Sequence, residues 1–393
     1  MRSTKHAIIF FLTIIFIISG QPIIFASTAN DEQDIEDAIL QEISLDGVQA
    51  YWDQLVTDYG GFLPDLEKSS IYEYVKNQES FSIKNTAIAF LEYLFHELIL
   101  NGKLLGSLLM LTLFSVVLQT MHTAFEHNAV SKIAYFVIYL VLIFLALNSF
   151  YLAVSYTQDA INAMKGFMIA LLPLVLGMMA TFGNVVSVSF FHPIIIFLIN
   201  FSGILVSSFI LPLLFLSALL LIVSSINDNY KVTHLANMFK SIGLGTLGIF
   251  LTIFLGVISV QGAAAAVQDG IAMKTAKFIT GNFIPVVGRT FTDAADTILS
   301  ASLILKNAVG MAGLFIILLI VIFPAIKIAA IAFIYKLAAA ILQPIGGGPV
   351  ISTLNTISTY ILYVLACLLV VSLMFLLAIV IIIAASNITI LLK

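Results

Sequence analysis

Long apolar stretches recur along most of this chain, and they limit the folds that it can adopt. A helix of about 20 apolar residues crosses the hydrocarbon core of a bilayer, and a helix satisfies its own backbone hydrogen bonds there. The pattern therefore predicts an all-α, polytopic integral membrane protein with about seven transmembrane helices, within a range of six to eight. The predicted spans lie at residues 104–121, 133–156, 166 onward, 193–223, 242–262, 311–323 and 359–385.

The composition supports this membrane class and argues against several others. Hydrophobic residues make up 61% of the 393 residues and charged residues 10%, against about 45–50% and about 25% in soluble domains. The single cysteine, Cys367, excludes an intramolecular disulfide and a thiolate metal cluster. The sequence has no basic tract that would suggest nucleic acid, and no phosphate-binding or catalytic motif. We therefore expect membrane lipid around the protein, no enzymatic activity, no metal and no cofactor.

Residues 1–29 have the pattern of a secretory signal peptide. Arg2 and Lys5 supply the basic start, residues 7–19 the apolar run, and residues 27–29 a small-residue cleavage site. An uncleaved anchor is the alternative, because the apolar character continues beyond the first run. Either arrangement places the region that follows outside the cytoplasm.

Residues 30–102 are predicted to form an acidic extracytoplasmic region in front of a multi-span domain, residues 103–393. Residues 27–102 hold 15 of the 21 Asp and Glu residues but only three lysines. The soluble part contains about fifty residues and the only tryptophan, which is too little for an independent hydrophobic core. We therefore expect it to dock on the membrane domain or on a partner. Apolar residues at helical spacing over 83–98 predict an interfacial helix that leads into the first span.

The stretch 277–348 carries ionisable residues within a largely apolar sequence. A charge at mid-membrane costs roughly 2.5–3.5 kcal/mol on insertion scales, so such residues persist where they face protein interior or water. We therefore select four of them as candidate pore or coupling residues: Arg289, Asp293, Asp296 and Lys327. Two alternatives to a pore or coupling role stay open. Residues 263–310 could instead form an amphipathic helix pair on the cytoplasmic surface, with solvated charges. Lys327 could instead extend its amine to an interface of the membrane.

Prolines and glycines mark candidate helix breaks or hinges in the membrane domain: Pro173, Pro212, Pro285, Pro324, Gly346, Gly347 and Gly348. Pro212 interrupts the stretch 193–223, which is either one tilted, kinked helix or two short re-entrant pieces. Pro173 and Pro285 are separated by 112 residues, as are Pro212 and Pro324. This offset predicts an internal repeat of 165–262 with 277–374, unless it is a coincidence in an apolar chain. Many transporters contain inverted repeats with broken helices near mid-membrane.

Three non-repetitive stretches resemble a known family of membrane proteins. They read ISLDGVQAYWDQLVTDYGGFLPD (43–65), GNFIPVVGRTFTDAADTILSASLILKNAVG (281–310) and LQPIGGGP (342–349). Through these stretches, and over nearly its whole length, the chain is similar to stage III sporulation protein AE of endospore-forming Firmicutes.

The resemblance implies a role in endospore development. The family is a polytopic component of the complex that links the mother cell and the engulfed forespore, a channel, feeding-tube or secretion-like apparatus needed for late forespore gene expression. It implies a place in the mother-cell membrane around the forespore, with the N-terminal region facing the intermembrane space. The implied partners are other proteins of the stage III sporulation A operon, including a secretion-type ATPase and ring-forming proteins, and stage II sporulation protein Q. The resemblance implies no catalytic residues.

Two other functions stay open beside that of a channel subunit. The predicted repeat and the ionisable residues favour a self-sufficient secondary transporter or permease, which would move its substrate without partners. A passive scaffold is the third function, and it would tolerate neutral replacement of all four candidate pore residues.

Overall fold

The structure, a computed structural model, describes residues 46–63, 83–124, 129–181, 185–226, 231–283, 287–344 and 349–391. Helices account for nearly all of these residues, and no strand occurs among them. The elements are α3 (Asp46–Tyr59), α6 (Ile83–Leu100), α7 (Gly102–Ala124), α8 (Ala129–Thr181), α9 (Val185–Leu205), the π-helical turn η1 (Val206–Ile210), α10 (Leu211–Ile226), α11 (Thr233–Phe283), α12 (Val287–Leu342) and α13 (Pro349–Leu391). The predicted all-α class is confirmed.

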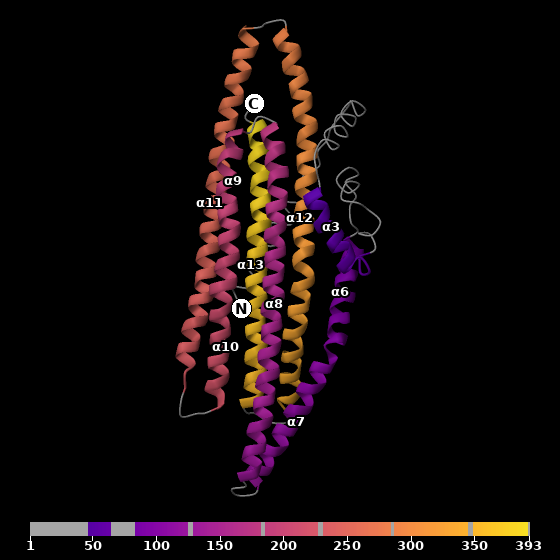
Figure 1. The fold of residues 1–393 in the computed structure, drawn as a ribbon, viewed down its shortest axis with the longest axis vertical. Coiled ribbons are helices and arrows are strands. Elements are labelled where there is room, and N and C mark those ends of the chain that lie inside the picture. Colours follow the sequence, from indigo (N-terminus) through magenta and orange to yellow (C-terminus); the bar gives the residue numbers. More distant parts are fainter. Residues whose placement is uncertain are drawn as a thin grey trace.

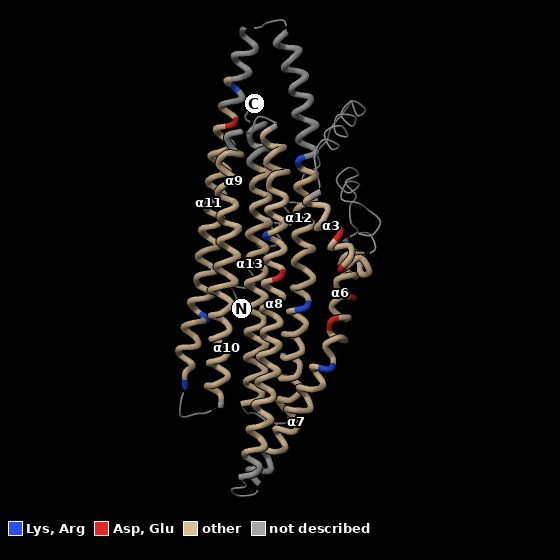
Figure 2. Tube along the Cα trace, viewed as in Figure 1, with Lys and Arg blue, Asp and Glu red and all other residues tan. Residues whose placement is uncertain are grey.

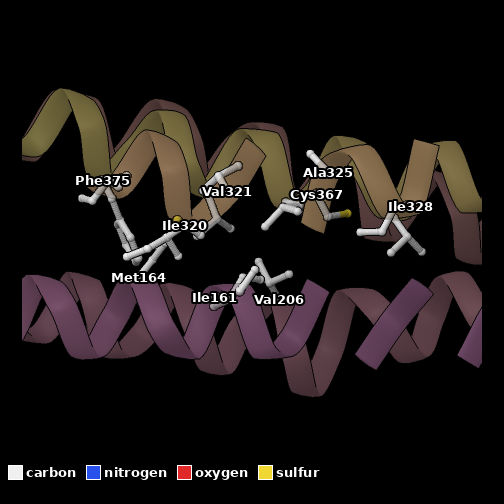
Figure 3. Packing of buried hydrophobic residues seen from close by; sticks show 14 of the residues in the cluster. Ile161, Met164, Val206, Ile320, Val321, Ala325, Ile328, Cys367 and Phe375 are labelled. Atoms are coloured by element: carbon white, nitrogen blue, oxygen red, sulfur yellow. The ribbon is translucent and has the colours of Figure 1, made fainter. Parts of the chain in front are cut away.

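Long helices that lie side by side form the body of the protein (Figure 1). Helix α13 packs against α8, α10, α11 and α12. Its buried residues recur at alternating intervals of three and four, the spacing of a continuous helix-packing face. They are Leu354, Ile357, Ile361, Val364, Leu368, Val371, Phe375 and Ala378. Figure 3 shows Val321 of α12 and Cys367 of α13 facing Ile161 of α8, so the apolar core extends along the bundle between these helices.

By length and composition, five helical segments among the described residues can cross a membrane. They are Ile133–Ala180, Val188–Ser225, Thr233–Ile271, Lys306–Leu342 and Pro349–Ala384. Helices α6 and α7 provide a sixth candidate, because they pass the same test together although they are bent by 46° relative to each other. Six is the lower end of the predicted range.

Two stretches that the sequence predicts as separate spans form one helix. Residues 133–156 and the stretch from residue 166 onward both belong to the 53-residue helix α8. The polar segment 157–165 between them contains neither Gly nor Pro, so no backbone breaker ends the helix there.

The stretch 193–223 is a single helical path and does not form two re-entrant pieces. Helices α9 and α10 follow each other through η1, which widens the helix for one turn. Pro212 is the second residue after this turn. Because proline lacks a backbone N–H, it weakens the hydrogen-bond ladder of the preceding turn, where η1 lies.

The long helices exceed the thickness of a bilayer. At 1.5 Å per residue, α8 is about 80 Å long and the 56-residue α12 about 84 Å long, against a hydrocarbon core of about 30 Å. At the end of the bundle where α11 and α12 are joined, both helices extend beyond α8 and α13 (Figure 1). Parts of these helices must therefore lie outside the hydrocarbon.

Tyrosine hydroxyls connect helices inside the bundle. The hydroxyl of Tyr139 on α8 lies 2.7 Å from the hydroxyl of Thr353 on α13, and Tyr335 on α12 donates to Ser149 on α8 at 2.9 Å. Hydrogen bonds of this kind contribute on average about 0.6 kcal/mol each between membrane helices. They set the register of α8 against its two neighbours.

Helix α3, from the acidic region, packs against α8 and α12 of the membrane domain. Val48, Trp52 and Leu55 are buried at helical spacing, and Trp52 is only 1% exposed. Tyr51 crosses Gly166 of α8 so closely that a Cβ at Gly166 would overlap the tyrosine hydroxyl. Of the two docking sites expected for the acidic region, the membrane domain or a partner, α3 uses the membrane domain.

Candidate functional site

A cavity of about 200 Å³ lies where α3 meets α8 and α12, and we call it the α3 cavity. Each helix contributes residues that are spaced to lie on one of its faces. On α8 these are Tyr156, Asp159, Ala160 and Ala163; on α12, Ile320, Pro324 and Lys327; on α3, Tyr51, Gln54, Leu55, Asp58 and Tyr59. The cavity therefore combines two carboxylates, one ammonium group, three phenols and an apolar floor.

Lys327 is half-buried in the α3 cavity. Its Nζ lies 5.5 Å from the ring centroid of Tyr156, within the range of a cation–π contact. Asp58 and Asp159, from α3 and α8, are both exposed. Among the described residues, neither carboxylate forms an ion pair with Lys327. The two signs of charge therefore share one cavity without neutralising each other in direct contact.

The aromatic side of the cavity holds α3 in place. The ring of Tyr59 stacks on Phe323 of α12 with centroids 3.7 Å apart and an interplanar angle of 2°. Tyr93 of α6 approaches the same Phe323 edge-on at 4.9 Å. Burial, and then the carboxylates of Asp58 and Glu97, raise the pKa of Tyr59 to about 12. Its phenol thus stays neutral and keeps its O–H donor at physiological pH.

The outer face of α3 is polar, which bears on what surrounds the cavity. Asp53, Gln54, Thr57 and Asp58 are all exposed, and Asp53 accepts a hydrogen bond of 2.7 Å from Gln49. Such a face is not compatible with hydrocarbon. Figure 2 shows acidic residues along α3 and α6 on this side, whereas most of the bundle carries few charges. The α3 cavity therefore opens toward water.

Pro324 adds a polar atom near the apolar floor. In a regular helix the N–H of this position would bond to the carbonyl oxygen of Ile320, four residues earlier. Proline has no N–H, so that carbonyl lacks its usual donor. Both residues line the cavity, three and seven positions before Lys327.

The predicted pore residues do not meet in one place. Lys327 lines the α3 cavity, whereas Arg289, Asp293 and Asp296 lie in the first turns of the same continuous helix α12. At 1.5 Å per residue they are about 46 to 57 Å from Lys327 along the helix axis. The side chains of these three residues lie outside the described residues, and their proposed role stays a prediction.

The predicted hinges have different surroundings. Pro173 and Pro324 lie inside α8 and α12, which continue through them, and Pro212 lies near the start of α10, after η1. Pro285 and the glycines Gly346, Gly347 and Gly348 lie outside the described residues. A hinge role for any of these positions, like the internal repeat, stays a prediction.

Sequence reasoning did not select Asp159, Asp58 or Tyr156. The segment 157–165 falls between two predicted spans, and Asp58 belongs to the acidic region, from which no site residue was selected. The signal was present nonetheless: Tyr156, Asp159 and Ala163 have the spacing of one helical face. Among the residues that the structure describes, no group of three His, Cys, Asp or Glu side chains is arranged to hold a metal ion.

Comparison with known proteins gives a consistent picture. The family model described as stage III sporulation protein AE matches residues 66–386, a range that contains the α8 and α12 walls of the cavity. Stage III sporulation protein AE of Bacillus subtilis (strain 168) is 51% identical over 391 residues, which cover 97% of this chain and 98% of that protein. No solved structure matches.

Proposed function

Because the chain belongs to the stage III sporulation protein AE family, we propose that it is a membrane subunit of the channel complex between mother cell and forespore. In this proposal the complex is a feeding-tube or secretion-like apparatus that endospore development and late forespore gene expression require. The similarity over nearly the whole chain carries the proposal. The multi-span helical body is compatible with it, since a channel subunit must be embedded in a membrane.

The proposal includes a location and partners. The chain would lie in the mother-cell membrane around the forespore, with residues 1–29 as its signal peptide and the acidic region in the intermembrane space. The partners would be the secretion-type ATPase and ring-forming proteins of the stage III sporulation A operon, and stage II sporulation protein Q. The polar outer face of α3 carries the exposed Asp53, which such contacts could use.

Affinity purification from sporulating cells tests this function. A tagged copy replaces the host's own AE protein, and the control is an unrelated tagged multi-span protein at the same level. We expect the ring-forming proteins and the ATPase to be retained with the tagged copy and not with the control. Normal sporulation without retention of any operon partner would refute the proposal.

A self-sufficient transporter remains the second candidate, because one chain supplies charges of both signs to the α3 cavity. That function predicts substrate uptake by liposomes that contain this protein alone. The channel-subunit function predicts that such liposomes show no concentrative uptake and that transfer requires the assembled complex.

A further inference from the structure

We propose that the α3 cavity binds one free amino acid with an apolar side chain, as the zwitterion. The inference goes beyond a role in a complex, because α3, α8 and α12 of this chain all line the cavity. It rests on the charges, the volume and the walls of the cavity.

The charges define the polar ends of the ligand. Lys327 lies in the same cavity as Asp58 and Asp159 without an ion pair among the described residues. Partly buried charges are stable when they are paired or hydrated. An amino acid supplies one ammonium and one carboxylate, so a single molecule would pair with both signs of charge.

The burial of these groups sets the orientation of the ligand. Lys327 is half-buried, whereas Asp58 and Asp159 are exposed at the mouth. The ligand carboxylate therefore points inward to Lys327, whose ammonium already rests on Tyr156. The ligand ammonium points outward to the two carboxylates.

The volume is sufficient for a small ligand. The cavity measures about 200 Å³, which is enough space for one amino acid.

The walls select an apolar side chain. Ala160 and Ala163 of α8 leave room that larger residues would fill, and Leu55 and Ile320 complete an apolar surface opposite them. A ligand side chain placed there removes apolar area from water, which contributes about 25 cal/mol per Å².

The charges of the cavity disfavour ligands with a single charge. A simple amine would leave Lys327 facing another cation, and an anion such as phosphate would meet two carboxylates and one lysine.

Binding of radiolabelled L-leucine to the full chain in lipid nanodiscs tests the proposal. The single tryptophan, Trp52, lies on α3 beside the lining residue Tyr51, so its fluorescence gives a second readout. Two competitors each lack one charge: 3-methylbutylamine has no carboxylate and 4-methylpentanoate has no ammonium. We expect leucine to bind at least about tenfold more tightly than either competitor, because each loses a charge-assisted hydrogen bond.

Matched variants separate the cavity from general charge effects. Lys327→Met and Asp159→Asn should each weaken leucine binding about tenfold or more. Lys336→Met is the control, since Lys336 lies on the same helix but is exposed and bonded to Asn355 outside the cavity. If Lys327→Met fails to fold, Asp159→Asn carries the test, because an exposed residue is replaced by an isostere.

Three outcomes would overturn the proposal. They are the absence of leucine binding, equal binding of leucine and of either competitor, and unchanged leucine binding in Asp159→Asn or in a folded Lys327→Met variant. Binding is measured on the isolated chain, so it does not depend on the channel complex. Loss of operon partners with intact leucine binding would refute the proposed function and leave this proposal standing.

Discussion

The close approach of α3 to Gly166 allows a sharp test of how the acidic region docks. In Gly166→Ala the new Cβ would overlap the hydroxyl oxygen of Tyr51, although the ring carbon behind it, Cζ, would lie at 3.5 Å, an ordinary contact. The hydroxyl must therefore move by about 1 Å to reach van der Waals distance. Tyr51 also meets Phe167 edge-on at 5.5 Å, so this movement disturbs the packing of α3 on α8.

The expected cost follows from overpacking, typically 1–3 kcal/mol. The matched control is Gly177→Ala on the same helix, where a Cβ would meet no atom within 4 Å. Alanine is the better helix former by about 1 kcal/mol, so the control should be neutral or stabilising. The docking free energies of the two variants should differ by roughly 1–3 kcal/mol.

A second substitution should reverse the effect. Tyr51→Phe removes the one atom that overlaps the new methyl group and keeps the ring, so Gly166→Ala/Tyr51→Phe should dock nearly as well as Tyr51→Phe alone. A double-mutant cycle measures the interaction energy between the two substitutions. This energy should equal the docking cost of Gly166→Ala in size and have the opposite sign.

The assay is the emission maximum of Trp52 and its quenching by acrylamide, recorded during denaturant titration. Trp52 is the only tryptophan and is buried where α3 docks, so release of α3 exposes it. If Gly166→Ala and Gly177→Ala behave alike, or if Tyr51→Phe does not rescue, the described packing of α3 is incorrect.

Three further predictions concern the same region and the ends of the bundle. Phe323→Ala removes the ring on which Tyr59 stacks and should cost about 3–5 kcal/mol, so that Trp52 becomes accessible to quencher. Burial is the main reason that the pKa of Tyr59 is raised to about 12, from about 10 in the unfolded chain. The contribution of Tyr59 to docking is therefore present below pH 10 and is lost between pH 10 and 12. Trp52 fluorescence should follow this loss. Arg289 lies in the part of α12 that extends beyond α8 and α13 (Figure 1), so the Arg289→Cys variant should react with a membrane-impermeant maleimide added on that side of the membrane. Cys367 is fully buried and should not react.

Each of these predictions has its own control. Phe333→Ala removes an exposed ring from α12 and should leave docking unchanged; an equal effect of both substitutions would contradict a specific role of the stack. Tyr59→Phe should abolish the change between pH 10 and 12, and persistence of that change would assign it to another group. Cys367→Ser supplies the labelling background, and an unreactive cysteine at 289 from both sides would favour membrane depth for the start of α12.

The sequence was sufficient to recognise Lys327 and insufficient to recognise its neighbours. A lysine within a long apolar run is visible locally, because such a charge is costly in lipid wherever the run packs. Asp159 sits in a short polar segment that suits either a loop or a helix face, and Asp58 resembles any solvated acid. These three residues come from segments about one hundred or more positions apart, and their meeting depends on contacts that no local pattern encodes.

The membrane class and the positions of most apolar helices follow from the sequence alone, because apolar length and backbone hydrogen bonding act within each segment. Tertiary structure decided which segments continue as one helix and which polar residues share a cavity. Segment 157–165 continues helix α8, with Asp159 in the α3 cavity and Gln158 bonded to the backbone of Ser207 on η1. Helix α3 lies over Gly166, whose missing side chain admits Tyr51. The α3 cavity therefore exists only once α3, α8 and α12 have packed together.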